Sequence, residues 1–172
     1  MNIEQRWWTD KDGWQPRAPE MGTRAQLLLV FGSTEALAAG TCLRELRAQY
    51  PSASLFGCST AGEIHGTKVM DGSVSATALE FSDTRFRAVT APLHDAAGSF
   101  ACGAELARQL PREKLVHVFV LSDGLHVNGS ELVLGLTQHL PAGVQVTGGL
   151  SGDADRFQRT LVLCYSEPQE RM

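Results

Sequence analysis

The chain has 172 residues, 43% of them hydrophobic and 20% charged, which suffices for one folded domain and is not the composition of a disordered protein. Its net charge is −4 with no basic cluster, which argues against a nucleic-acid partner. No apolar run approaches the roughly 20 residues of a membrane span, and the polar N-terminus lacks the apolar core of a signal peptide. We therefore expect a cytoplasmic protein that binds neither nucleic acid nor membrane.

Residues 1–22 are polar apart from three tryptophans and show no clear period. We expect an irregular N-terminal arm whose tryptophans cap the domain or contact a partner. The domain itself is predicted over 23–166, followed by a polar tail over 167–172.

The domain opens with a continuous apolar run over 26–33, which predicts a buried strand. A helix over 34–49 should follow, because Ser33 or Thr34 can cap it and Pro51 stops it. Its predicted inner face consists of Ala39, Cys42, Leu43, Leu46 and Tyr50.

Two predicted strands come next in the chain, over 52–60 and 73–81, separated by a flexible loop over 66–72. Alternating residues over 84–93 predict a further strand. The intervening residues 82–83 suit a tight hairpin turn.

The second half is predicted from the same kinds of pattern. Its elements are a helix over 96–109, a buried strand over 115–124, a third helix capped by Asn128, and strands over 144–153 and 157–165. Glu131 stands at the capping-box position of that third helix, with Leu132, Leu136 and Leu140 facing inward.

The two halves match at an offset of 90 residues. Residues 29–31 fall on 119–121, and residues 50–51 fall on 140–141. We therefore predict an α/β fold in which a mixed sheet is flanked by helices and is built from two pseudo-repeated strand–helix–strand halves.

Turns of small residues follow four of the predicted strands, at 31–34, 57–63, 121–124 and 147–153. Ligands of α/β sheets collect at the carboxyl ends of strands, so we expect these turns to surround one small molecule. The predicted ligand-binding residues are Gly57, Cys58, Ser59, Thr60, Ala61, Gly62, Glu63, Ser122, Asp123, Asn128, Gly148, Gly149, Ser151, Gly152 and Asp153.

The stretch GCSTAGEI at 57–64 resembles the FIST family of bacterial sensory domains. Stretches at 27–33, 121–136 and 146–163 agree with the family in the same order, so the resemblance covers roughly 22–165. It implies a non-catalytic sensory domain in signal transduction that binds a small molecule such as an amino acid. A partner such as a histidine kinase or a cyclic-di-GMP enzyme would receive the signal.

The resemblance also leaves two alternatives open. One branch of the family binds haem, for which His65 or His126 would be the axial ligand here, although we expect no cofactor. Family members normally continue into a C-terminal half, so this chain is either a fragment or a short member. It would then form a homodimer or associate with a C-terminal FIST half.

An enzymatic alternative is a thiol-dependent hydrolase or transferase that uses Cys58, activated by His65 or His126. Small residues at this position also suit a tight turn, and the G-x-S-x-G pattern of hydrolases is absent, so we favour binding without catalysis. The four cysteines form no C-x-x-C pair, so we expect free thiols and no metal site.

Three acidic residues at the turns, Glu63, Asp123 and Asp153, allow two interpretations. Glu63 and Asp153 could act as an acid–base pair, and Asp123 could act with His126. Alternatively, they bind the ammonium group of a ligand or hydrogen-bond their own turns.

Overall fold

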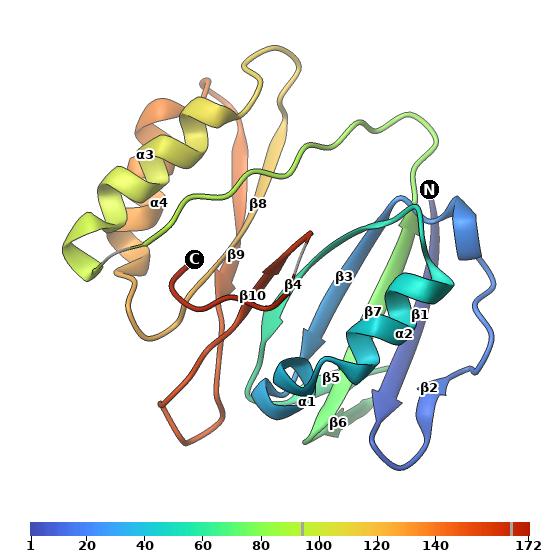
Figure 1. Ribbon diagram of the computed structural model, residues 1–172. Coiled ribbons are helices and arrows are strands. Elements are labelled where there is room, and N and C mark those ends of the chain that lie inside the picture. Colours follow the sequence, from blue (N-terminus) through green and yellow to red (C-terminus); the bar gives the residue numbers. More distant parts are fainter. Residues whose placement is uncertain (94, 166) are drawn as a thin grey trace.

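The computed structural model describes residues 1–93, 95–165 and 167–172, and it has the predicted α/β architecture (Figure 1). The strands are β1 (Asn2–Thr9), β2 (Gly13–Gln15), β3 (Leu27–Gly32), β4 (Ser54–Ser59), β5 (Glu63–His65), β6 (Lys68–Met70), β7 (Ser73–Glu80), β8 (His117–Ser122), β9 (Gln145–Leu150) and β10 (Val162–Cys164). The helices are α1 (Thr34–Ala39), α2 (Thr41–Gln49), α3 (Ser99–Gln109) and α4 (Gly129–His139). No helix of the described ranges is long and apolar enough to cross a membrane.

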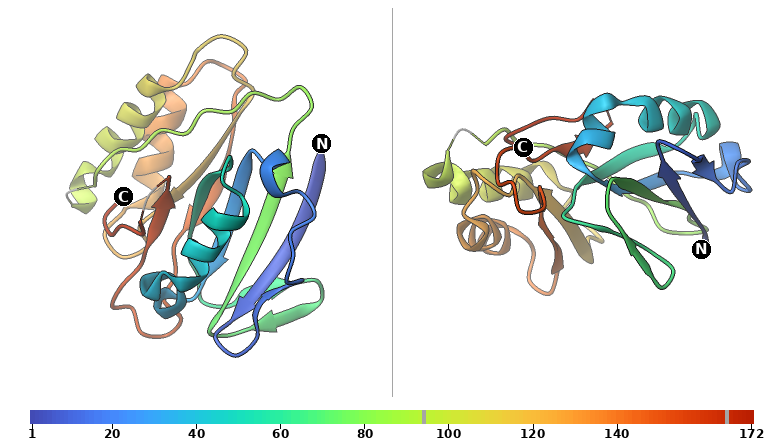
Figure 2. Two further views of the ribbon diagram at one scale, coloured as in Figure 1. Left: turned by 45° about the vertical axis from the view of Figure 1, so that its right-hand side comes forward. Right: turned by 90° about the horizontal axis from the view of Figure 1, so that it is seen from below.

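A mixed six-stranded sheet forms the larger part, in the order β10-β4-β3-β7-β1-β2. Only β3 and β4 are parallel neighbours in it. Helices α1 and α2 cover one face of this sheet, whereas α3 and α4 pack on a separate parallel pair, β8 and β9 (Figure 2).

The prediction of an irregular N-terminal arm was wrong, because residues 2–9 form β1 and pair with β7 along its whole length. The buried face of β1 carries Glu4, Arg6 and Trp8. Two of these three side chains are charged, so the sequence does not show the alternation of apolar and polar residues that marks a half-buried strand. Trp8 and Trp14 lie in the core and do not cap it from outside.

The Arg6 side chain, only 1% exposed, fixes residues that follow β2. Its Nε and Nη2 atoms donate to the Pro16 carbonyl at 3.0 and 2.6 Å, and Nη2 also donates to the Arg17 carbonyl at 3.0 Å. Nη1 donates to Gln49 Oε1 at the end of α2, and the guanidinium lies over the Trp14 ring. A buried guanidinium needs such partners, because burying an unpaired charge would lower the stability of the fold by about 3–5 kcal/mol.

The predicted helix over 34–49 is two helices, because Gly40 adopts a left-handed conformation with φ 73° and ends α1. Ser33 caps α1, its Oγ accepting the Ala36 N–H at 3.2 Å. The break leaves Ala39 exposed, contrary to the prediction. The other predicted inward residues, Cys42, Leu43, Leu46 and Tyr50, are buried.

Two predictions between β4 and α3 were wrong. Residues 84–93 contain no strand where the structure describes them, because β1 and β3 already occupy both edges of β7. The hairpin expected at 82–83 is therefore absent from this described segment. Strands β5 and β6 form a hairpin instead. Strand β5 precedes the predicted loop over 66–72, and β6 lies within it.

The second half has the predicted order of elements, including the Asn128 cap, whose Oδ1 accepts the Glu131 N–H at 3.3 Å. Strand β8 is not buried as predicted, since Phe119 is 38% exposed. The reason is that β8 pairs with β9 alone and has helices on one face only. Strand β10 covers only three residues of the predicted 157–165. Both halves contain a parallel strand–helix–strand unit, while their equivalence as a repeat stays a prediction.

Helices α3 and α4 approach each other closely through two glycines. A Cβ atom on Gly103 would lie 2.2 Å from the Leu132 carbonyl oxygen, and one on Gly135 would lie 2.1 Å from that of Phe100. Side chains at these positions would force the helix pair apart, so the sequence requires glycine there.

Candidate functional site

The four predicted turns gather along one edge of the molecule, at the carboxyl ends of the parallel strands. Backbone hydrogen bonds join them in pairs: Thr60 N–H to the Gly32 carbonyl (3.0 Å), Gly152 N–H to the Ser59 carbonyl (2.8 Å) and Ser151 N–H to the Ser122 carbonyl (2.8 Å). The strand-end turns therefore lie together as expected, while their use as a binding site stays a prediction.

Glu63 organises the turn that follows β4. Its carboxylate is buried and accepts the Thr60 hydroxyl at 2.7 Å. It also accepts the backbone N–H and the hydroxyl of Ser73 at 3.1 and 2.8 Å. Glu63 thus ties this turn to the beginning of β7.

Asp123 organises the turn that follows β8. Its Oδ1 accepts the N–H groups of Leu125 and His126 at 2.8 and 2.7 Å and lies 3.0 Å from His126 Nδ1. Its Oδ2 accepts the Arg171 N–H at 3.1 Å. Burial alone would raise the pKa of Asp123, but these hydrogen bonds outweigh it and lower the pKa below its ordinary value.

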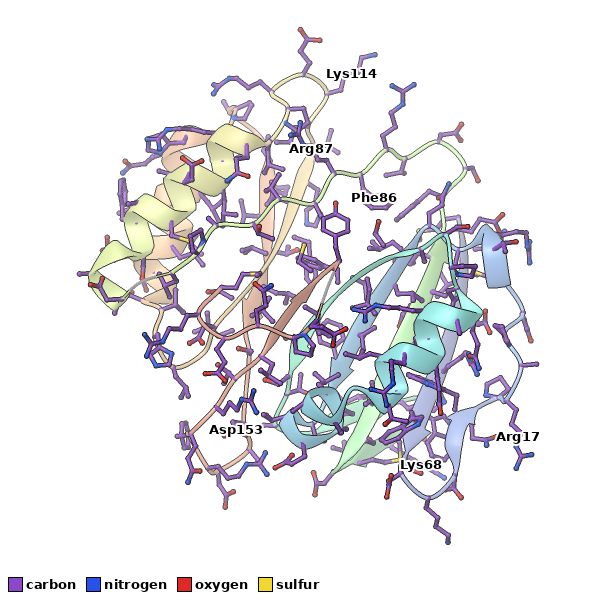
Figure 3. All side chains as sticks on the ribbon, viewed as in Figure 1. Arg17, Lys68, Phe86, Arg87, Lys114 and Asp153 are labelled. Carbon is purple, nitrogen blue, oxygen red and sulfur yellow. The ribbon has the colours of Figure 1, made fainter. Side chains whose placement is uncertain are left out.

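Asp153 lies in the loop that follows β9 and faces α1 across the larger hollow (Figure 3). Its Oδ1 accepts Nε and Nη2 of Arg156 at 3.0 and 2.7 Å, and its Oδ2 accepts the backbone N–H groups of Gln158 and Arg159. Burial opposes the charged form, yet the bonds from Arg156 and the loop hold the pKa of Asp153 well below its usual range. Arg156 Nη1 also contacts Glu35 Oε1 at 2.5 Å.

The lowered pKa of Asp153 predicts acid sensitivity. A carboxylate with a folded pKa below its unfolded value stabilises the fold above about pH 4 and loses that contribution as the pH falls further. We expect Asp153→Asn to lower the melting temperature at pH 7 and to flatten its decline between pH 5 and 3, measured by circular dichroism. The exposed Asp83→Asn variant is the control and should follow the wild type. Equal acid slopes for wild type and Asp153→Asn would contradict this role.

Two hollows flank Arg156 at this edge. The smaller, of about 140 Å³, is lined by Ser33, Glu35, Thr60, Ala61, Gly62, Glu63, Asp71, Gly72, Ala154 and Arg156. The larger, of about 270 Å³, is lined by Thr34, Glu35, Ala38, Asp153, Arg156, Gln158 and Arg159. Three carboxylates and one guanidinium line the smaller hollow, so its surroundings are acidic.

The predicted site residues divide between these hollows and the structure around them. Thr60, Ala61, Gly62 and Glu63 line the smaller hollow and Asp153 lines the larger. Ten others line neither: Gly57, Cys58, Ser59, Ser122, Asp123, Asn128, Gly148, Gly149, Ser151 and Gly152.

Sequence reasoning missed Arg156 and Glu35, which line both hollows. Glu35 stands in the first turn of α1, where an acidic residue is ordinary helix chemistry. The spacing of Asp153 and Arg156 at i and i+3 could have indicated the ion pair, but a loop offers no period from which to predict it.

A comparison with protein families covers nearly the whole chain. The FIST N domain family model matches residues 26–171. The chain belongs to the FIST family. No curated protein and no solved structure matches it. FIST is a sensory domain family, so membership indicates a small-ligand binding domain in signalling and leaves the ligand unspecified.

Haem binding would need His65 or His126 as its axial ligand, and the structure shows the surroundings of both. His65 lies in β5 with its ring 6.2 Å from that of Trp7, while the His126 ring is held by Asp123. Neither histidine lines either hollow. The described ranges also contain no group of three His, Cys, Asp or Glu side chains able to hold a metal ion.

Cys58 is poorly suited to act as a nucleophile. Its side chain is buried, with 3% of the residue exposed, and burial raises the pKa of the thiol to about 12. The thiolate required for attack is therefore strongly disfavoured at neutral pH.

Proposed function

We propose that this FIST domain is a cytoplasmic, non-catalytic sensor that binds an amino-acid-like small molecule. The site is the smaller hollow between the turn at 60–63 and Arg156. The observation that carries the proposal is that a strand-end turn of the family motif, Thr60 to Glu63, forms one wall of a hollow with charges of both signs.

The charges around this hollow suit a zwitterion. Glu35 and the exposed Asp71 stand on the acidic side and would attract an ammonium group. Arg156 supplies a guanidinium for a carboxylate if the ligand inserts between Arg156 and Glu35, which pair with each other in the free protein. The volume of about 140 Å³ suits a small polar molecule and lies below the range of drug-sized ligands.

The way in which the acidic groups are used supports binding without turnover. Glu63, Asp123 and Asp153 each accept several hydrogen bonds from the protein, so they are committed to holding turns. The thiol alternative based on Cys58 has no support in its buried position. A sensor without chemistry of its own needs a second protein for output, and a histidine kinase or a cyclic-di-GMP enzyme is the partner class we propose.

Binding should raise the melting temperature, because a ligand that binds only the folded state stabilises it by about 2.7 kcal/mol at a hundredfold excess over Kd. The probes are the proteinogenic amino acids, with methylamine and acetate as half-ligands. Thermal shift followed by calorimetry gives the affinity. We expect Glu35→Gln to weaken binding of the best amino acid at least about tenfold, the effect of losing one charge-assisted contact.

The matched control is Glu105→Gln, which removes an exposed carboxylate from α3, far from the hollow in sequence and fold. This variant should bind as the wild type does. The proposal fails if no amino acid raises the melting temperature or gives a heat of binding. It also fails if Glu35→Gln and Glu105→Gln weaken binding equally.

A further inference from the structure

The face of the six-stranded sheet opposite α1 and α2 carries apolar residues on β1, β3 and β4, with Ser75 and Thr77 of β7 between them, and it is only partly covered. On β3, Leu28 and Val30 point into the core, so Leu27, Leu29 and Phe31 point the other way. Register partners on adjacent strands point to the same side of a sheet. Phe56 of β4 is the partner of Leu29, so it lies on this side. Ile3 of β1 does too, because Ile3 and Leu27 both pair with Leu79 of β7.

This surface extends towards the second pair of strands. The Phe119 ring of β8 meets the Phe56 ring edge-on, with centroids 6.1 Å apart. We call the surface formed by Ile3, Leu27, Leu29, Phe31, Phe56 and Phe119 the open face. Ile3 is 58% and Phe119 38% exposed, and the four residues between them are half-buried.

No acidic or basic residue points to this side from β1, β3, β4 or β7, all of which the structure describes, and on β8 the exposed His117 shares the side of Phe119. The chain as a whole carries a net charge of −4, so two copies repel each other over most of their surfaces. The open face is a place where two copies can meet without bringing like charges together.

The exposed surface of the molecule is larger than its mass requires. It measures 9366 Å². A folded monomer of 18.6 kDa is expected to expose about 8,200 Å². The excess of about 1,100 Å² belongs to the molecule as a whole, and it is large enough to include the roughly 800 Å² that each partner buries in a standard protein–protein interface.

We propose that the open face binds the open face of a second copy of this chain, giving a twofold-symmetric dimer. Two sheets packed in this way lie about 10 Å apart with strands crossing at roughly 30°. The helices α1 and α2 of each copy would then form the two outer layers. The β5–β6 hairpin, which contacts Trp7 through His65, lies at one border of the interface.

Sedimentation velocity of the full chain from about 1 to 200 μM tests the proposal, because dimerisation depends on concentration. We expect a monomer–dimer equilibrium in the wild type. Phe119→Ser should raise the dimer Kd at least about tenfold, the cost of removing one aromatic anchor. Phe157→Ser is the matched control, since Phe157 is 75% exposed in the loop after β9 and should leave Kd unchanged.

Ile3→Ser is the second variant, in case Phe119→Ser perturbs the fold. Ile3 is well exposed in the monomer, so its loss should weaken the dimer and leave the melting temperature of dilute protein unchanged. A wild type that stays monomeric throughout the range overturns the proposal. A dimer that Phe119→Ser, Ile3→Ser and Phe157→Ser affect equally overturns it too, since another surface would then mediate association.

Discussion

Gly57→Ala is expected to leave little folded protein. A Cβ atom at this position would lie 1.8 Å from the carbonyl oxygen of Val30, its register partner on β3. That oxygen belongs to the backbone of a central strand and cannot move away as a side chain can. The two parallel strands would have to separate, so we expect a loss of at least about 3 kcal/mol, the upper range for overpacked cores.

Gly149→Ala provides the matched control on β9, because a Cβ atom there meets nothing within 4 Å. We expect its free energy of unfolding to stay within about 0.5 kcal/mol of wild type. Urea denaturation of both variants followed by circular dichroism makes the comparison. A Gly57→Ala protein as stable as Gly149→Ala would show that the strands do not pack as closely as described.

Arg6→Met should be the most damaging change outside the glycines. Its guanidinium donates to two backbone carbonyls and to Gln49, and it lies 5.4 and 5.8 Å from the centroids of the Trp14 and Tyr50 rings. Methionine fills similar space but leaves those buried acceptors without donors. The expected loss is about 3–5 kcal/mol, the range for breaking a buried charged network.

The control for Arg6→Met is Arg24→Met, which removes another arginine from the same part of the chain. Arg24 pairs with Glu80 at 3.3 Å, but its side chain is 58% exposed. Exposed pairs contribute about 1 kcal/mol or less, so this variant should melt close to the wild type. Chemical denaturation at neutral pH gives both values. Similar losses for the two variants would contradict the structural role of Arg6.

Strong periodic patterns predicted most of the fold from sequence. The apolar run of β3, the Asn128 cap and the inward leucines of α4 each carry a local signal that the tertiary structure retains. Failures arose where distant segments decide the outcome. Residues 84–93 alternate like a strand, but β1 arrives from the other end of the chain and takes the edge they would have used.

The sequence predicted that the strand-end turns would gather, whereas most of the predicted site residues line neither hollow and the binding site itself stays a prediction. Strand-end turns gather by a rule of topology, so Thr60 to Glu63 and Asp153 could be located from sequence. Arg156 and Glu35 approach each other only after α1 and the loop following β9 are in place. The predicted carboxylates accept hydrogen bonds from backbone N–H groups of the protein itself. Sequence alone does not distinguish this use from ligand binding.

The pairing of β1 with β7 also has a consequence for synthesis of the protein. Asn2 and Glu80, at one end of this pairing, are 78 residues apart in the chain. At roughly 5–20 residues per second, several seconds pass on the ribosome between their appearance. During that interval β1 can pair only with the short strand β2, so its two tryptophans lack the longer partner β7 that flanks them in the folded protein. Exposed apolar segments of this kind are the ones that chaperones bind.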